Sequence, residues 1–195
     1  MKKSPAWRSA VAVQIVLIAA IAAAVFMGIY GVISSHKSGG EDTTLKLWSY
    51  NLDKNTVSCQ YTVKAHDKDV MSIDTTSNNQ VVASGSQDKT IKLWRASDLA
   101  ELAVLRGHRR GIWCVKFSND EPILASSSTD TTVKIWNIDD FTCLRTFEGH
   151  ECSVLRVMFV TESQQVLTAG ADGNLKLWNM RTNDCAGTFD GHEGR

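Results

Sequence analysis

Serine, histidine and aspartate recur together in this sequence, and these are the residue types of a hydrolase catalytic triad. His66, Ser84 and Asp88 form the first set, and Trp94 follows six residues after the aspartate. The set repeats with a step of 42 residues, with threonine in place of serine the third time, and the later members are His108, Ser126, Asp130, Trp136, His150, Thr168, Asp172 and Trp178. A triad occurs once in an active site, whereas a set repeated at a fixed period indicates a repeated structural unit.

The four residue types of each set can satisfy one another's polar atoms. The aspartate accepts a hydrogen bond from one ring N–H of the histidine, and the other ring nitrogen accepts from the hydroxyl. The hydroxyl oxygen in turn accepts the indole N–H, so no buried polar group stays unpaired. The sequence also has no G-x-S-x-G turn to expose a nucleophile. We therefore expect four-residue structural tetrads, with no catalytic residues, no cofactor and no metal site.

Runs of β-branched and other apolar residues lie between these marks and predict β-strands. The first 42-residue unit has four such runs, at Val70–Thr75, Val81–Gly85, Thr90–Trp94 and Glu101–Leu105. The runs of the next two units are Ile112–Ser118, Ile123–Ser127, Thr132–Trp136, Cys143–Phe147, Val154–Val160, Val166–Ala169, Asn174–Trp178 and Ala186–Phe189. Four antiparallel strands in each unit are expected.

The first strand of the second unit is apolar on both faces. Simple alternation places Trp113, Val115 and Phe117 on one face, and Ile112 and Cys114 on the other. A sheet with two apolar faces is expected to lie between neighbouring sheets.

The phrases GSQDKTIKLW, SSTDTTVKIW and AGADGNLKLW, with Gly-His before each following unit, resemble the WD-repeat family. The resemblance implies an all-β fold in which four-stranded blades are arranged radially as a β-propeller. The chain would contain part of such a propeller, with three complete repeat units and two partial units. The expected divisions are a junction with a partial blade at 34–65, blades at 66–107, 108–149 and 150–191, and the start of another at 192–195. Because closed propellers have at least four blades, a fragment of a longer propeller is expected.

The resemblance also implies a binding surface, formed by the loop after each histidine and by the residue before each tetrad aspartate. These positions are Asp69, Met71, Gln87, Gly111, Trp113, Thr129, Ser153, Leu155 and Ala171. Trp113, with Arg109 and Arg110 beside it, is the candidate anchor, because tryptophan and arginine dominate interface hot spots. Packing of Trp113 between blades is the alternative.

Longer phrases carry a closer resemblance. AHDKDV, GHRRGIWCVKFS and DFTCLRTFEGHECSVLRVMF are similar to the transducin-beta-like, U-three snoRNA-associated family of the small-subunit processome, over about residues 38–195. This resemblance implies a non-enzymatic scaffold in the nucleolus that binds processome subunits during pre-rRNA processing and ribosome biogenesis. Residues 38–195 carry a net charge of −4, so contact with RNA is expected to be indirect, through protein partners.

The amino terminus differs in composition from the rest of the chain. A basic flank at 1–9 contains Lys2, Lys3 and Arg8, and an almost wholly apolar run follows at 10–33. As a helix this run would span roughly 36 Å, enough to cross a bilayer core of about 30 Å. It predicts a transmembrane helix ahead of the propeller. The alternative function is therefore a single-pass membrane protein that displays a WD-repeat interaction domain. A cleaved signal peptide, a buried segment of the propeller and a misassigned first exon are the competing interpretations of the run.

Five cysteines without C-x-x-C spacing predict reduced thiols rather than a zinc site.

Overall fold

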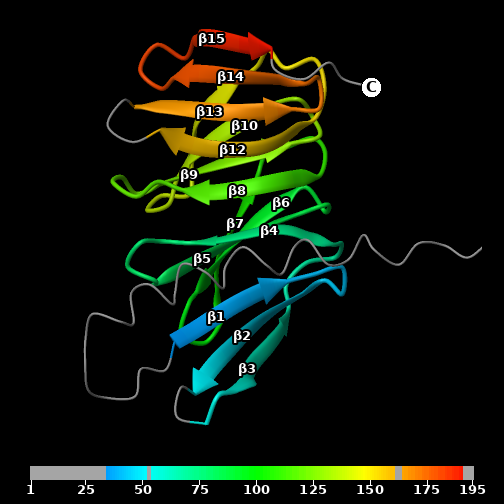
Figure 1. Ribbon diagram of the computed structural model, residues 1–195, viewed down its shortest axis with the longest axis vertical. Helices are drawn as coiled ribbons and strands as arrows, with labels where there is room; N and C mark the ends of the chain where they lie inside the picture. Colours follow the sequence, from blue (N-terminus) through cyan, green and yellow to red (C-terminus); the bar gives the residue numbers. More distant parts are fainter. Residues whose placement is uncertain (1–33, 52–53, 161–163, 191–195) are drawn as a thin grey trace, which may run out of the picture. The chain divides into compact units, whose positions relative to one another are not determined.

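The computed structural model describes residues 34–51, 54–160 and 164–190, and every regular element in these ranges is a β-strand (Figure 1). The chain divides into two compact units, one of residues 1–38 with 46–62 and one of residues 39–45 with 63–195. The transmembrane helix predicted for residues 10–33 lies outside the described residues. Within them, no helix has the length and apolar character needed to cross a membrane.

The first unit contains most of a three-stranded sheet, in the order β1 (Ser34–Gly39), β2 (Thr44–Asn51) and β3 (Thr56–Lys64). The sequence did not predict β1, because Ser35, His36 and Lys37 stand where the other units have apolar residues. Strand pairing uses backbone groups, which every residue but proline supplies in full, so a polar segment can still pair with its neighbour.

The second unit contains three antiparallel sheets of four strands each, and in every sheet the strands lie in chain order. The sheets consist of β4 (Val70–Thr75), β5 (Val81–Ser86), β6 (Thr90–Arg95) and β7 (Glu101–Arg106); β8 (Ile112–Phe117), β9 (Ile123–Ser128), β10 (Val133–Asn137) and β11 (Cys143–Phe147); and β12 (Val154–Val160), β13 (Gln165–Gly170), β14 (Asn174–Asn179) and β15 (Cys185–Asp190). All twelve strands predicted from the sequence are present, with ends that agree to within one residue.

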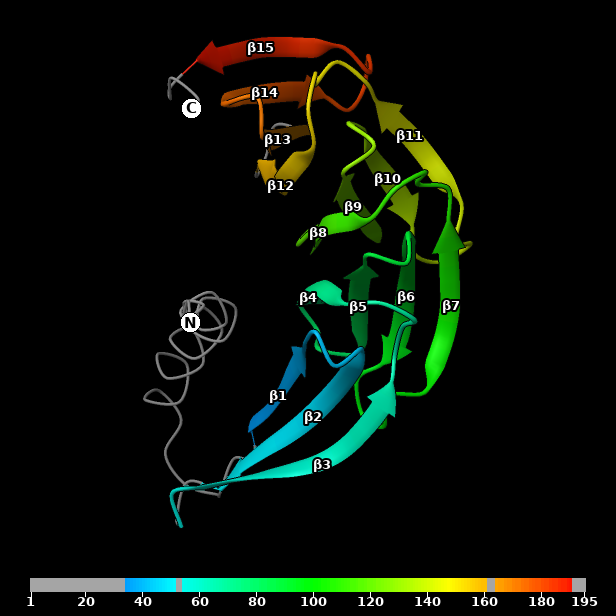
Figure 2. The same cartoon turned by 90° about the vertical axis from the view of Figure 1, so that its right-hand side faces the viewer.

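Within this unit the three sheets follow one another face to face. In Figure 2, β4, β8 and β12 lie along the inner side of the curved row of sheets, and β7, β11 and β15 lie along its outer side. Two apolar clusters fill the spaces between sheets. One contains Ile91 and Leu105 of the first sheet with Val115 of the second, and the other contains Phe147 of the second sheet with Val157 of the third. The two-faced apolar pattern of the second sheet therefore matches its place between two neighbours.

A β-bulge in each first strand corrects the prediction of which side chains share a face. In β8, Ile112 pairs with Ser128 and Cys114 pairs with Ser127, so Trp113 is an extra residue without a partner on β9. Ile112 and Cys114 consequently lie on opposite faces. Ile112 packs towards the first sheet and Cys114 towards the third, contrary to simple alternation.

Candidate functional site

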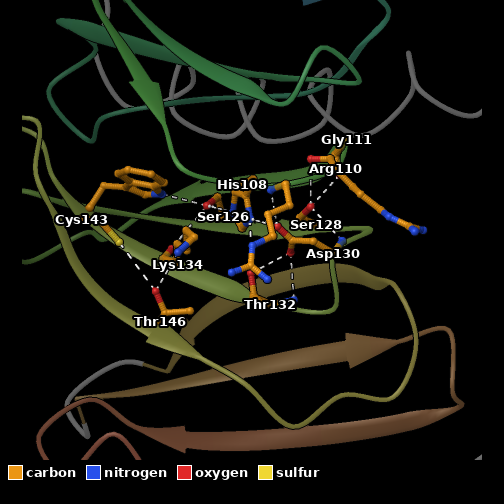
Figure 3. Close-up of polar contacts among 12 residues, drawn as sticks. His108, Arg110, Gly111, Ser126, Ser128, Asp130, Thr132, Lys134, Cys143 and Thr146 are labelled. Atoms are coloured by element: carbon orange, nitrogen blue, oxygen red, sulfur yellow. Dashed lines mark hydrogen bonds and ion pairs between the residues drawn. The ribbon is translucent and has the colours of Figure 1, made fainter.

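The three sets of histidine, hydroxyl residue, aspartate and tryptophan are each connected by hydrogen bonds within one sheet. In the second sheet His108 Nδ1 donates to Asp130 Oδ2 over 2.9 Å, and Ser126 Oγ donates to His108 Nε2 over 2.8 Å. Trp136 Nε1 then donates to Ser126 Oγ over 2.8 Å (Figure 3). The first and third sheets repeat these three contacts with distances of 2.7 to 2.9 Å.

The turn between the second and third strands of each sheet holds the aspartate in place. Asp130 Oδ1 accepts the Thr132 hydroxyl at 2.7 Å and the Thr132 backbone N–H at 3.0 Å. Thr131 stands between these two residues with a φ of 71°, in the left-handed region. The corresponding residue of the third sheet is Gly173, with a φ of 83°, and only glycine adopts this conformation without steric cost.

The network sets the ionisation of its members. Burial alone raises the pKa of Asp88, Asp130 and Asp172, but hydrogen bonds from the histidine, from backbone N–H groups and, in the first two, from a threonine hydroxyl lower each pKa below its ordinary value of 3.8. Burial of the imidazole lowers the pKa of His66 below 6.5, against the opposing effect of the Asp88 carboxylate. At neutral pH the ionised Asp88 therefore holds a neutral His66 in a single tautomer.

This geometry gives the hydroxyl oxygens no role as nucleophiles. Ser84, Ser126 and Thr168 are completely or almost completely buried, and each oxygen already accepts an indole N–H while its proton faces a histidine. A substrate carbonyl would have to reach about 3 Å from such an oxygen, and burial leaves it no approach. What the arrangement can do is hold together the second and third strands of one sheet, the turn between them and the loop that precedes the first strand.

Backbone hydrogen bonds bring together the predicted surface positions of each unit. Gln87 N–H donates to Asp69 O at 3.1 Å, and Thr129 N–H donates to Gly111 O at 2.9 Å. The third unit repeats the contact between Ala171 and Ser153 at 2.8 Å. The loop after each histidine is thus fixed to the turn that carries the tetrad aspartate.

The bulged residues of the three first strands are also among the predicted positions. These residues are Met71, Trp113 and Leu155, and each is partly or largely exposed. Trp113 Nε1 is buried and has no hydrogen-bond partner among the described residues. Arg109 and Arg110 are exposed, and the Arg110 side chain extends away from the tetrad (Figure 3).

Contacts of Ser72 and Asp74 with the neighbouring sheet were not predicted from the sequence. Ser72 Oγ accepts the Val115 N–H at 3.2 Å, and Asp74 accepts the Phe117 N–H and also pairs with Lys116. Equivalent positions one unit later hold Cys114 and Lys116, so the 42-residue period gives no signal for these contacts. All five cysteines fall in the described ranges and are free thiols, and only Cys114 is buried.

Comparison with known sequences identifies one family. The profile described as "WD domain, G-beta repeat" matches residues 57–95, 99–137 and 141–179, which together make up more than half of the chain. Each of the last two segments begins just before the fourth strand of one sheet and ends with the last residue of the third strand of the next sheet. The segments matched by the family profile are therefore out of phase with the four-stranded sheet, whereas each 42-residue unit that begins at a tetrad histidine contains the four strands of one sheet.

Similar proteins cover smaller parts of the chain. Human transducin beta-like protein 3 is 44% identical over an alignment of 83 residues, and the match covers 37% of this chain and 10% of that protein. The ribosome biogenesis protein WDR12 homolog of Drosophila persimilis is 37% identical over 59 residues, which is 30% of this chain and 14% of that protein. The chain thus spans about a tenth to a seventh of the length of these relatives.

Solved structures resemble the fold over most of the chain. The structures titled "Structure of U3-55K" and "Crystal structure of RRP9 WD40 repeats" each superpose with a TM-score of 0.75 at 24% identity, covering 86% of this chain and 54% of the other. At this level of identity the likeness describes the fold.

Proposed function

Because the chain belongs to the WD-repeat family, we propose that it is a non-enzymatic scaffold that binds processome subunits in the nucleolus during pre-rRNA processing. The observation that carries the proposal is the tetrad geometry. Every hydroxyl that resembles a nucleophile is buried and hydrogen-bonded in a repeated structural network. What is left exposed is a set of preorganised loops, which suit binding rather than catalysis.

The proposal that the chain acts in ribosome biogenesis is supported by its similar proteins. The phrases around Gly107–Ser118 and Asp140–Phe159 resemble the processome family, and transducin beta-like protein 3 is among the similar proteins. A second relative carries ribosome biogenesis in its name. The net charge of −4 over residues 38–195 favours contact with RNA through protein partners rather than directly.

The proposed binding surface centres on Trp113 and extends to Asp69, Met71, Gln87, Thr129, Arg109 and Arg110. The loops at these positions are held by backbone hydrogen bonds, so binding costs little ordering entropy. The guanidinium groups of Arg109 and Arg110 have no partner among the described residues and are available to a carboxylate of another protein.

The experiment uses the full-length chain with an epitope tag, expressed in its native cells. We expect purification to recover small-subunit processome proteins together with precursor rRNA. Charge reversal at both exposed arginines, Arg109→Glu with Arg110→Glu, should reduce recovery by about tenfold, as expected for an interface hot spot. Leu102→Ala, which changes an exposed side chain on β7, is the matched control and should leave recovery unchanged.

Three outcomes contradict the proposal. Recovery of no processome protein by the parent chain excludes the assembly, and equal recovery by the charge-reversed variant and the control excludes this surface. Precursor rRNA that remains bound after the proteins are removed with salt would indicate direct RNA binding instead.

A further inference from the structure

The bulge residue of the second sheet carries a polar atom that the fold does not use. Trp113 is partly exposed, but its indole N–H is buried and meets no hydrogen-bond acceptor within the described ranges. A buried donor without an acceptor costs stability. The bulge positions of the first and third sheets hold Met71 and Leu155, which have no N–H group in their side chains. The fold therefore needs no donor at this position, and the tryptophan N–H is available to another molecule.

The loop before β8 carries two adjacent cations without counterions. Arg109 and Arg110 are exposed, and neither guanidinium has a partner in the part of the chain that the structure describes. The loop of the first unit differs, because Asp67 Oδ1 lies 3.6 Å from Lys64 Nζ and the two charges offset each other. The third unit has Glu151 in place of Arg109. Of these three loops, the second is therefore the one that attracts an anionic group.

Hydrogen bonds and close packing fix the backbone of this loop. The Ser128 hydroxyl lies 3.1 Å from Arg110 O and 2.9 Å from Gly111 O (Figure 3). Gln87, from the turn of the first sheet, lies against the same loop, since a β-carbon at Gly111 would collide with Oε1 of the glutamine. The first and second sheets therefore present one continuous surface here, and a partner does not have to order the loop backbone.

Two guanidinium groups and an indole N–H without an acceptor all suit a carboxylate. We propose that this surface binds an acidic segment of a partner protein, and that a carboxylate of the segment accepts the Trp113 indole N–H. The inference rests on the proposed function and adds the chemistry of the partner to it. The indole ring turns on binding to bring its buried N–H to the carboxylate, and such side-chain changes are common when interfaces form.

The charges of the neighbouring loops favour a protein segment over RNA as the occupant. Asp69 of the first unit and Glu151 of the third are exposed on either side of the two arginines in the repeat order. An RNA backbone carries a negative charge at every nucleotide and would be repelled by both acidic residues. A protein segment can instead place one or two carboxylates at the arginines and neutral side chains beside them.

The test measures binding of defined peptides to the full-length chain. The glutamate peptide is synthetic and fluorescein-labelled, with two adjacent glutamates flanked by leucine, glycine and serine, and the control peptide has glutamine in place of both glutamates. Fluorescence anisotropy should show saturable binding of the glutamate peptide, at least about tenfold tighter than binding of the control peptide. Arg109→Gln with Arg110→Gln should remove this preference. Arg106→Gln with Arg145→Gln neutralises two exposed arginines on β7 and β11 and, as the matched control, should keep it.

Trp113→Phe separates binding from packing, because phenylalanine keeps an aromatic ring and removes the N–H. The variant should bind the glutamate peptide about tenfold more weakly, as expected for the loss of one hydrogen bond to a charged acceptor. Without peptide it should unfold at the same or a higher urea concentration than the parent chain, because no buried donor is left without an acceptor. A tryptophan that only packs between sheets would give the opposite pair of results, with a lower urea midpoint and unchanged peptide binding.

Four results would overturn the proposal. The first is equal binding of the two peptides, and the second is a Trp113→Phe variant that binds as the parent chain does or unfolds at a lower urea concentration. The third is a fluorescein-labelled oligouridylate that binds more tightly than the glutamate peptide, which would make the occupant RNA. The fourth is a dimer of the unliganded chain that Arg109→Gln with Arg110→Gln dissociates, which would make it a second copy. No processome protein takes part in these measurements, so their failure is distinguishable from failure of the proposed function.

Discussion

Asp74 on β4 accepts the backbone N–H of Phe117 on β8 over 2.8 Å and so reaches from one sheet to the free edge of the next. β8 is the edge strand of its sheet, and the N–H groups on its outer side have no strand to pair with. The second carboxylate oxygen of Asp74 lies 3.0 Å from Lys116 Nζ. One side chain therefore covers an exposed strand edge and joins two sheets.

Variants at Asp74 and Lys116 separate the contribution of the hydrogen bond to stability from that of the ion pair. Asp74→Ala removes the acceptor of the Phe117 N–H and should lower the free energy of unfolding by about 1–2 kcal/mol. Lys116→Met removes only an ion pair whose lysine is about half exposed, and it should cost less than about 0.5 kcal/mol. Urea unfolding followed by tryptophan fluorescence measures both changes. A Lys116→Met loss as large as that of Asp74→Ala would show that the ion pair dominates.

The hydroxyl group at the centre of each tetrad should contribute more to the stability of the fold than its size suggests. Ser126→Ala leaves His108 Nε2 and Trp136 Nε1 without partners in a buried site, and it should destabilise the fold by about 2–4 kcal/mol. Thr168→Ser keeps the hydroxyl of the third tetrad and is the conservative control, with a cost of about 1 kcal/mol for the lost methyl group. Equal losses in the two variants would contradict the hydrogen-bond account.

The residue after the tetrad aspartate has a positive φ and is threonine in the second sheet and glycine in the third, so the two residue types can be exchanged. Thr131→Gly relieves a β-branched residue at positive φ and should stabilise the fold by about 0.5–1 kcal/mol. Gly173→Thr introduces the same strain into the third sheet and should destabilise it by about 1–2 kcal/mol. The change in urea midpoint measures both variants, and a shift of the same sign in both would contradict the prediction.

Acid should destabilise the fold in two steps. The pKa of His66 is lower in the folded chain than its ordinary value of 6.5, so the unfolded chain binds this proton more readily. The stability that His66 contributes is therefore fully present above pH 6.5, and it is lost as the pH falls from 6.5 towards the lower pKa of the folded chain. The lowered pKa values of the three tetrad aspartates add a second loss below pH 3.8.

The histidine contribution can be isolated with His66→Asn. The variant is less stable at every pH, but its urea midpoint should change less than that of the parent chain between about pH 8 and about pH 5. If the urea midpoint changes with pH equally in the variant and in the parent chain over this range, His66 is excluded as the source of the first loss of stability.

The period of the sequence predicted the strands well, because tryptophan and histidine fix the phase of each unit. It could not predict the bulges. Alternation counts residues, and the extra residue Trp113 moves Ile112 to the face opposite Cys114 without a change in composition. It also missed β1, since Ser34–Gly39 pairs through its backbone and has no apolar pattern.

Contacts between units were the other part that the period could not supply. Asp74 faces Phe117, whereas one unit later Lys116 stands at the equivalent position and cannot accept a hydrogen bond. A periodic pattern contains only the residues that the units share, so it cannot predict a contact that occurs between just one pair of units. The loop contacts between Gln87 and Asp69 recur in all three units, and the positions they join were predicted.

The phase difference between the segments matched by the family profile and the sheets bears on how such chains change in length. The segment 99–137 supplies β7 to the first sheet and β8, β9 and β10 to the second. Duplication or loss of one such segment leaves every internal sheet with four strands, because each copy completes the sheet before it and begins the one after it. The number of repeats can therefore drift during evolution without an intermediate that contains a broken sheet.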